Sequence, residues 1–153
     1  MAGIKLIATN RKAVRDYSLQ DRHEAGLALL GTEIKSIRAG MVNLTDGFVQ
    51  VRDGEMWLLN VHIAPYDPAG RRGHEPRRPR KLLLHRQEIA RLTSRVQERG
   101  YTIVPVRLYL KGGRAKVEIA LARGKRQYDK REAIARRDTE REIDREWKER
   151  SRR

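Results

Sequence analysis

Cysteine is absent from this 153-residue sequence, and aromatic residues make up only 5% of it. The first absence excludes disulfide bonds, thiolate metal ligands and cysteine nucleophiles. The second argues against a surface on which many successive nucleobases stack. Apolar runs such as Leu82-Leu83-Leu84 fall far short of the roughly 20 residues of a membrane span. No signal-like apolar stretch opens the sequence, so we expect a cytoplasmic location and no membrane partner.

Positive charge is what the sequence has in excess. There are 35 Lys and Arg residues against 20 Asp and Glu residues, which gives a formal net charge of +15. Lys and Arg outnumber Asp and Glu both in residues 1–122 and in residues 123–153. A chain with this charge attracts polyanions. The composition therefore predicts a partner covered in phosphate.

Residues for catalysis are scarce. The four histidines, at positions 23, 62, 74 and 85, have no metal-ligand spacing, and no phosphate-binding loop or nucleophile motif is present. Glu24 and Glu33 are nine residues apart on different expected elements, which is poor evidence for a carboxylate pair. We therefore expect no catalytic residue, no metal and no cofactor, and we predict that the protein is not an enzyme.

The apolar pattern predicts two hairpins. One alternates from Phe48, turns at Asp53-Gly54 and returns through Glu55–Val61. The other alternates over Val106–Lys111, turns at Gly112-Gly113 and returns over Lys116–Leu121 with one apolar and one cationic face.

The remaining segments are expected to surround these hairpins. They are an irregular basic arm over residues 1–23, a buried strand at Gly26–Leu30, a short helix from Thr32 as N-cap to Gly40, a mobile basic loop over residues 65–79, and a helix over Arg86–Arg99 before Gly100. Short strands, tight turns and two short helices favour a mainly β fold with flanking helices, a small closed or partly closed antiparallel barrel.

The division of the chain is expected near Gly124. Residues 1–123 form the predicted body with its N-terminal arm, and residues 124–153 form a basic junction and tail. The tail contains good helix formers but few large apolar residues. Its acid-before-base pairs contribute only about 0.2–0.5 kcal/mol each, so we expect it to be disordered when free and helical when bound.

Two interpretations remain open for the basic segments. In the junction, Lys125, Arg126, Lys130 and Arg131 would contact phosphates while Tyr128 stacks on a base. Alternatively, Tyr128 closes the barrel and the charges are a solvated boundary. The loop from Arg71 to Arg80 is either a phosphate-binding segment or a solubilising linker.

Several ordered motifs resemble the SsrA-binding protein family of bacteria, also called small protein B or SmpB. The resemblance extends from about Asn10 to Arg131 and is carried by Asn10-Arg11-Lys12-Ala13, Tyr17, Glu24-Ala25-Gly26, Gly31 to Gly40, Asn43-Leu44, Arg80 to His85 and Gly124 to Arg131. One departure is Tyr128, where some family members carry His.

The resemblance implies an OB-fold-like barrel and an adaptor that catalyses no covalent step. Such an adaptor binds the tRNA-like domain of transfer-messenger RNA and delivers it to stalled 70S ribosomes for trans-translation. Its tail would occupy the empty mRNA channel near the decoding centre of 16S rRNA. Elongation factor Tu and alanyl-tRNA synthetase would be indirect partners, since they carry and charge the same RNA.

The resemblance also implies two sets of site residues. The expected RNA-binding residues are Asn10, Arg11, Lys12, Tyr17, Glu24, Lys81, Leu83, Gly124, Lys125 and Arg126. The expected ribosome-binding tail residues are Tyr128, Asp129, Lys130, Arg131, Arg137 and Trp147. Glu24 would accept hydrogen bonds from base amino or imino groups or from ribose 2′-hydroxyls. A general RNA chaperone, a ribosome-associated structural protein and an RNA-modifying enzyme are the alternatives, the last lacking any visible cofactor or metal site.

Overall fold

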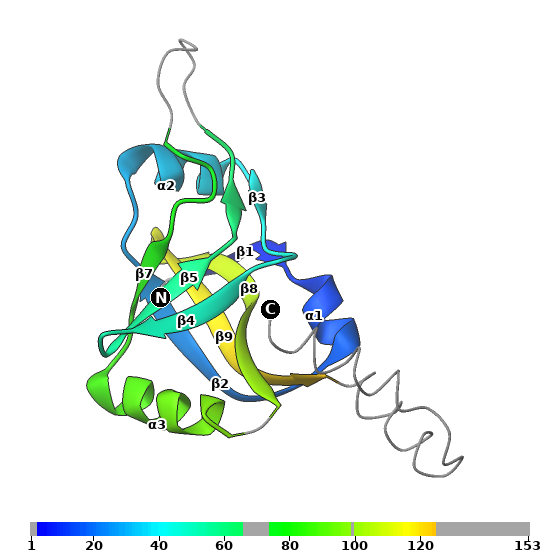
Figure 1. Cartoon of the computed structure of the whole chain (residues 1–153). Coiled ribbons are helices and arrows are strands. Elements are labelled where there is room, and N and C mark those ends of the chain that lie inside the picture. The colour runs from blue at the N-terminus through cyan, green and yellow to red at the C-terminus, as the bar shows by residue number, and fades with distance from the viewer. Residues whose placement is uncertain (1–2, 66–73, 99, 125–153) are drawn as a thin grey trace.

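A computed structural model of the chain describes residues 3–65, 74–98 and 100–124 (Figure 1). Within these residues the elements follow one another as β1 (Ile4–Thr9), α1 (Arg11–Asp16), β2 (Tyr17–Leu27), α2 (Gly31–Arg38), β3 (Val42–Asn43), β4 (Phe48–Arg52), β5 (Glu55–Leu59), β6 (His62–Ile63), β7 (Arg80–Leu83), α3 (Arg86–Val96), β8 (Tyr101–Lys111) and β9 (Arg114–Gly124). The expected tail lies outside the described residues.

Six strands close into an antiparallel barrel in the order β8-β4-β5-β7-β2-β9, because β9 pairs back onto β8. β4 meets β8 at Ile103, whereas β1 pairs with β8 further along, from Arg107 to Lys111. A register shift between Pro105 and Arg107 separates the two halves of β8. Together with three helices around the barrel, this arrangement confirms the mainly β, OB-fold-like class.

Both predicted hairpins are confirmed. Asp53 and Gly54 have φ angles of 49° and 76° between β4 and β5, and Gly112 and Gly113 have φ angles of 58° and 79° between β8 and β9. Positive φ at both central residues is what a type I′ turn requires. Alternate residues of β9 then point into the core, where Val117, Ile119 and Leu121 have no exposed surface.

The helix boundaries are partly as expected. Gly40 has a φ of 76° just after α2, which confirms the expected end of that helix. Its N-cap is Leu30 instead of Thr32, because the Glu33 Oε1 atom accepts a 2.8 Å hydrogen bond from the Leu30 backbone N–H. α3 ends with Gln97 as C-cap, so Gly100 is not its C′ residue.

The expectation of an irregular arm over residues 1–23 is wrong. This region contains β1, α1 and most of β2. The strand expected at Gly26–Leu30 is instead the end of β2, which stops at Leu27. Asp21 has a φ of 54° within a register shift between Gln20 and His23, and this irregularity interrupts the alternation that would have indicated a long strand.

The core is continuous through the barrel and extends beneath α2 and α3. Ile37 from α2 and Leu92 from α3 are fully buried against it. In Figure 1 these two helices lie at opposite ends of the barrel, and α1 lies at its side. Ala13 from α1 belongs to a second, smaller core with Val104 and Ala122. α2 and α3 therefore cover the two ends of the barrel, and α1 covers part of its side.

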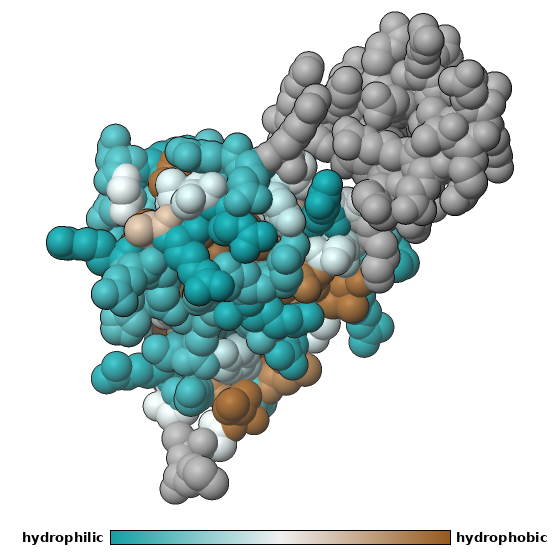
Figure 2. All heavy atoms as spheres, turned by 90° about the horizontal axis from the view of Figure 1, so that it is seen from below, coloured by the Kyte–Doolittle hydropathy of each residue, from teal (hydrophilic) through white to brown (hydrophobic). Residues whose placement is uncertain are grey.

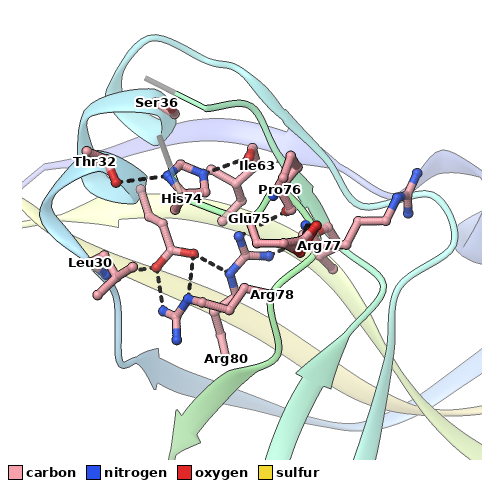
Figure 3. Close-up of polar contacts among 12 residues, drawn as sticks. Leu30, Thr32, Ser36, Ile63, His74, Glu75, Pro76, Arg77, Arg78 and Arg80 are labelled. Carbon is pink, nitrogen blue, oxygen red and sulfur yellow. Dashed lines mark hydrogen bonds and ion pairs between the residues drawn. The ribbon is translucent and has the colours of Figure 1, made fainter. Parts of the chain in front are cut away.

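A buried polar cluster joins α2 to the chain that enters β7 (Figure 3). Glu33 and Arg80 are both fully buried, and their Oε2 and Nε atoms are 2.6 Å apart. Arg78 Nη2 lies 2.6 Å from Glu33 Oε1. The other Arg80 nitrogens donate to the backbone carbonyls of Val61 and Pro76 at 2.7 and 3.0 Å. Each charge is thus paired and hydrogen-bonded, as a buried ion pair must be.

His74 extends the same cluster. Its Nε2 donates to the carbonyl of Ile63 at 2.8 Å, and in the neutral imidazole its Nδ1 then accepts from the Thr32 hydroxyl at 2.9 Å. These contacts correct two expectations for the basic loop. Residues 74–79 are held in place, while residues 66–73 lie outside the described part of the chain. Arg78 and Arg80 are structural residues, not members of a solubilising linker.

The buried pair predicts a large stability effect. Glu33→Gln would leave the Arg80 guanidinium buried without its counter-charge, and we expect it to lower the free energy of unfolding by about 3–5 kcal/mol. Urea denaturation measures the difference. Glu55→Gln removes the partner of Lys81 in an exposed ion pair and serves as control, with an expected change below about 1 kcal/mol. Equal effects of the two substitutions would contradict the structural role of Glu33.

The same pair predicts a loss of stability in acid. Burial opposes ionisation of Glu33, but hydrogen bonds from Arg78, the Leu30 N–H and Arg80 hold the pKa of this carboxyl below its usual value of 4.5. A lowered folded-state pKa stabilises the protein above the usual pKa, and this contribution disappears as the pH falls through the folded-state pKa. Urea denaturation from pH 7 to pH 3 should show a steeper acid loss for the wild type than for Glu33→Gln.

Candidate nucleic-acid interface

One surface of the barrel carries several of the expected RNA-binding residues. It consists of the outward side chains of β7, β2, β9 and β8, which are consecutive in the barrel, and we call it the outer face. On β7, Lys81 and Leu83 point outward, since the alternating Arg80 and Leu82 are buried. On β2, Glu24 lies opposite Glu118 of β9, so both are on this face.

α1 covers one end of the outer face. Ala13 packs there with Val104 and Ala122, and Tyr17 borders this small core. Tyr17 pairs directly with Gly124 at the end of β9. The neighbouring helix residues Arg11 and Lys12 are exposed, and Lys12 Nζ lies 3.5 Å from Asp46 Oδ1. The structure therefore brings these expected residues together at one end of the face.

Asn10 differs from the rest of the set because it is buried. Its Nδ2 donates to the carbonyls of Pro105 and Leu44 at 2.9 and 3.3 Å, and its Oδ1 accepts from the Ala13 N–H at 3.1 Å. Only 1% of the residue is exposed. The side chain caps α1 and ties it to β8, so it acts through the placement of the helix.

At the other end of the outer face, Glu24 is held by two neighbours. The Tyr109 hydroxyl donates to its Oε2 at 2.5 Å, and Lys111 Nζ lies 3.5 Å from the same atom. The Tyr109 hydrogen bond, with the nearby positive charge of Lys111, keeps the pKa of Glu24 below its usual value against the opposing effect of burial. Burial and the Glu24 carboxylate raise the pKa of Tyr109, so the phenol keeps its proton.

A second acid on this face holds two arginines. Glu118 accepts hydrogen bonds from Arg107, whose Nη2 lies 3.1 and 3.0 Å from its two oxygens, and from Arg22 Nη1 at 2.9 Å. The hydrogen bonds and charge of Glu118 raise the pKa of Arg107. The outer face is therefore an organised array of both charge signs and not a uniformly positive surface.

Gly26 makes part of this face flat. It lies between Leu83 of β7 and Lys116 of β9, which are its direct partners in the sheet. A Cβ atom at Gly26 would stand 3.3 Å from the Leu83 Cβ and 3.7 Å from the Lys116 Nζ. Leu83 is 52% exposed, so an apolar surface adjoins the carboxylate of Glu24. Such a surface suits a planar ring with polar groups at its edge.

Sequence reasoning did not single out the partners that organise this face. Tyr109, Arg107, Lys116 and Glu118 were visible only as the polar side of an alternating hairpin. The hydrogen bond from Tyr109 to Glu24 and those from Arg107 to Glu118 depend on which strands are neighbours. Lys81, which was expected to bind RNA, lies within 2.5 Å of Glu55. The remaining expected residues lie outside the described part of the chain: Lys125, Arg126, Tyr128, Asp129, Lys130, Arg131, Arg137 and Trp147.

The described residues form neither a metal-binding cluster nor a membrane-spanning helix. Within residues 3–65, 74–98 and 100–124, no group of three or more His, Cys, Asp or Glu residues is placed to hold a metal ion. No helix in these ranges is long and apolar enough to cross a membrane. Figure 2 shows the molecule from below Figure 1, where α3 lies, and this surface is mainly hydrophilic with small separate apolar areas.

Comparison with known proteins identifies the family. The family described as SmpB protein matches residues 7–149. The chain belongs to the SmpB protein family. Over 150 residues it is 61% identical to the SsrA-binding protein of Roseiflexus sp. strain RS-1, covering 97% of this chain and 95% of that one. It is 56% identical over 140 residues to the SsrA-binding protein of Carboxydothermus hydrogenoformans, covering 92% and 94%.

A solved structure supports the same membership. It is described as "tmRNA-SmpB: a journey to the center of the bacterial ribosome", and its matching chain is 48% identical, with a TM-score of 0.67. The match covers 77% of this chain and 83% of that chain. This chain and that solved chain are thus similar in both sequence and fold.

Substitutions at Asn10 and Arg11 test whether the buried Asn10 side chain stabilises the fold while the exposed Arg11 side chain does not. Asn10→Ala removes the helix cap and leaves buried carbonyls unpaired, so we expect a loss of about 1–3 kcal/mol in the free energy of unfolding. Arg11→Ala, at an exposed neighbouring position, is expected to change stability by less than about 0.5 kcal/mol. Thermal unfolding by circular dichroism compares the two. An Asn10→Ala variant as stable as the wild type would disprove the structural role of Asn10.

Proposed function

We propose that this protein is the adaptor of trans-translation. In this role it binds the tRNA-like domain of transfer-messenger RNA through the outer face and delivers that RNA to stalled ribosomes. The observation that carries the proposal is the outer face itself, where Tyr17, Glu24 and Leu83 lie on adjacent strands of a barrel belonging to the SmpB family. The adaptor itself performs no covalent step.

The charges of the outer face support binding to a structured RNA. Exposed Arg11 and Lys12 on α1 would contact phosphates and provide the part of the affinity that depends on salt. Glu24 cannot serve that purpose because a carboxylate repels phosphate. It would instead accept a hydrogen bond from a base edge or a ribose hydroxyl, and unpaired nucleotides expose base edges that pairing occupies in a duplex. The outer face would therefore attract RNA phosphates through its basic residues and select particular nucleotides through Glu24.

We assign the remaining residues of the proposed interface by their place in the chain. Gly124 ends β9 beside Tyr17, so Lys125 and Arg126 follow directly after the outer face. Residues 1–123 would form the RNA-binding body, and residues 124–153 the junction and ribosome-binding tail. Within that tail, Tyr128, Asp129, Lys130, Arg131, Arg137 and Trp147 would bind in the empty mRNA channel near the decoding centre of 16S rRNA.

The proposal also sets the wider context of the protein. Alanyl-tRNA synthetase charges the RNA and elongation factor Tu carries it, so both would be indirect partners that share the RNA and not the outer face. The work would take place in the cytoplasm, on translating ribosomes. Neither step calls for a metal or an organic cofactor bound to this chain.

The experiment that tests the proposal separates RNA binding from ribosome rescue. The full chain and a 1–126 truncation are titrated with transfer-messenger RNA and an unrelated structured RNA at two salt concentrations. Both are then assayed for tagging on stalled ribosomes. We expect both forms to prefer transfer-messenger RNA at the higher salt, and only the full chain to support tagging.

Two outcomes would contradict the proposal. If the preference disappears as salt rises, phosphate contacts alone explain the binding and the protein is a general RNA chaperone. If the truncated chain supports tagging as well as the full chain does, the tail has no role in rescue.

A further inference from the structure

We propose that Tyr109 is a positioning residue for RNA recognition, whose hydroxyl fixes the Glu24 carboxylate to accept an N–H or O–H donor from an unpaired nucleotide. This inference rests on the proposed function, because it concerns the same outer face. The expected RNA-binding set did not include Tyr109, which lies on β8, across β9 from β2.

The geometry leaves one carboxylate oxygen available. Among the described residues, the polar contacts of the Glu24 side chain come from the Tyr109 hydroxyl at 2.5 Å and from Lys111 Nζ at 3.5 Å, and both meet Oε2. Oε1 takes part in neither contact. A carboxylate oxygen has lone pairs for further donors, and the Glu24 side chain is 37% exposed. A nucleotide on the outer face can therefore reach Oε1 without displacing Tyr109.

Tyr109 is the contact that gives this carboxylate a fixed direction. A Glu side chain has three rotatable bonds, and holding a freely rotating side chain in one geometry costs conformational entropy at the moment of binding. Lys111 is a flexible partner whose side chain is 47% exposed. Tyr109 is half-buried, with a rigid ring that has only two rotatable bonds. Its hydroxyl therefore places Oε2 before any RNA arrives.

The hydrogen bond also fixes which group carries the proton. Tyr109 lowers the pKa of Glu24, and burial together with Glu24 raises the pKa of Tyr109. The phenol remains the donor and the carboxylate remains an acceptor only. The other charged groups around the pair are Arg107 and Lys111 on β8 and Lys116 and Glu118 on β9. Among them, only Glu118 shares the charge sign of Glu24, and it is bound to arginines.

The surroundings indicate what the carboxylate accepts from. A phosphate is repelled by Glu24, whereas base amino and imino groups and the ribose 2′-hydroxyl are donors. Gly26, which has no side chain, and the exposed Leu83 lie near Glu24 and Tyr109, and the apolar face of a base would pack on them. The Lys116 ammonium, close to Gly26, would contact a phosphate. The site thus fits an unpaired nucleotide whose base or ribose donates to Oε1.

The first test compares hydroxyl deletions in the full-length protein. We expect Tyr109→Phe to weaken binding to the tRNA-like domain of transfer-messenger RNA by about three- to ten-fold. The salt dependence should stay unchanged, because no phosphate contact is lost. The matched control is Tyr101→Phe, which removes a hydroxyl that accepts a hydrogen bond from Gln20 at the other end of β8 and should leave affinity within about two-fold.

The second test asks whether Tyr109 acts through Glu24. If it does, adding Tyr109→Phe to Glu24→Gln should cost less affinity than it does in the wild type, so the two losses are not additive. A pH titration of binding gives an independent readout. Without the hydroxyl, the Glu24 pKa rises toward its usual value, and binding should decline on acidification at a higher pH than in the wild type.

Short single-stranded RNA and DNA of one sequence distinguish the two donor sources. A Tyr109→Phe defect on both indicates a base donor, and a defect on RNA alone indicates the 2′-hydroxyl. If Tyr109→Phe binds every probe as the wild type does, and the wild type still prefers the tRNA-like domain, the positioning role is overturned while the proposed function stands. If the wild type shows no preference, the proposed function fails and this inference fails with it.

Discussion

The pairing of β9 with two strands along its whole length is the constraint on which the rest of the structure depends. β9 pairs with β2 from Lys116 to Gly124 and with β8 from Arg114 to Arg123, and this double pairing closes the barrel. Because side chains alternate along a strand, the same pairing sends Val117 and Ile119 into the core and Lys116 and Glu118 outward. Core and outer face are therefore two results of one register, and a slip of one residue would exchange them.

Much of the fold could be predicted where the signal is local. The two hairpins carry their turn residues between alternating strands, and the end of α2 is marked by one glycine. β1 could not be predicted in this way, because Ile4 pairs with Lys111, more than a hundred residues away. Arg80 was misleading for a similar reason. Its charge indicated a surface residue, but its partner Glu33 is 47 residues earlier in the chain, and only the folded barrel brings them together.

The candidate site could be predicted from sequence only as a set of separate positions. Family resemblance indicated Tyr17, Glu24 and Leu83, but nothing local showed that β7, β2, β9 and β8 are neighbours or that these side chains share a face. Asn10 illustrates the opposite limit, since a motif residue that was expected to bind RNA is a buried helix cap in the structure. Tyr109 had no motif at all, and its relation to Glu24 depends on an 85-residue separation closed by the sheet.

The pairing of Tyr17 with Gly124 has a mechanical consequence. Gly124 is the last residue of a strand clamped on both sides, and it stands opposite the residue where α1 gives way to β2. The point at which the described chain leaves the barrel is therefore set by backbone pairing to lie beside the C-terminal end of α1.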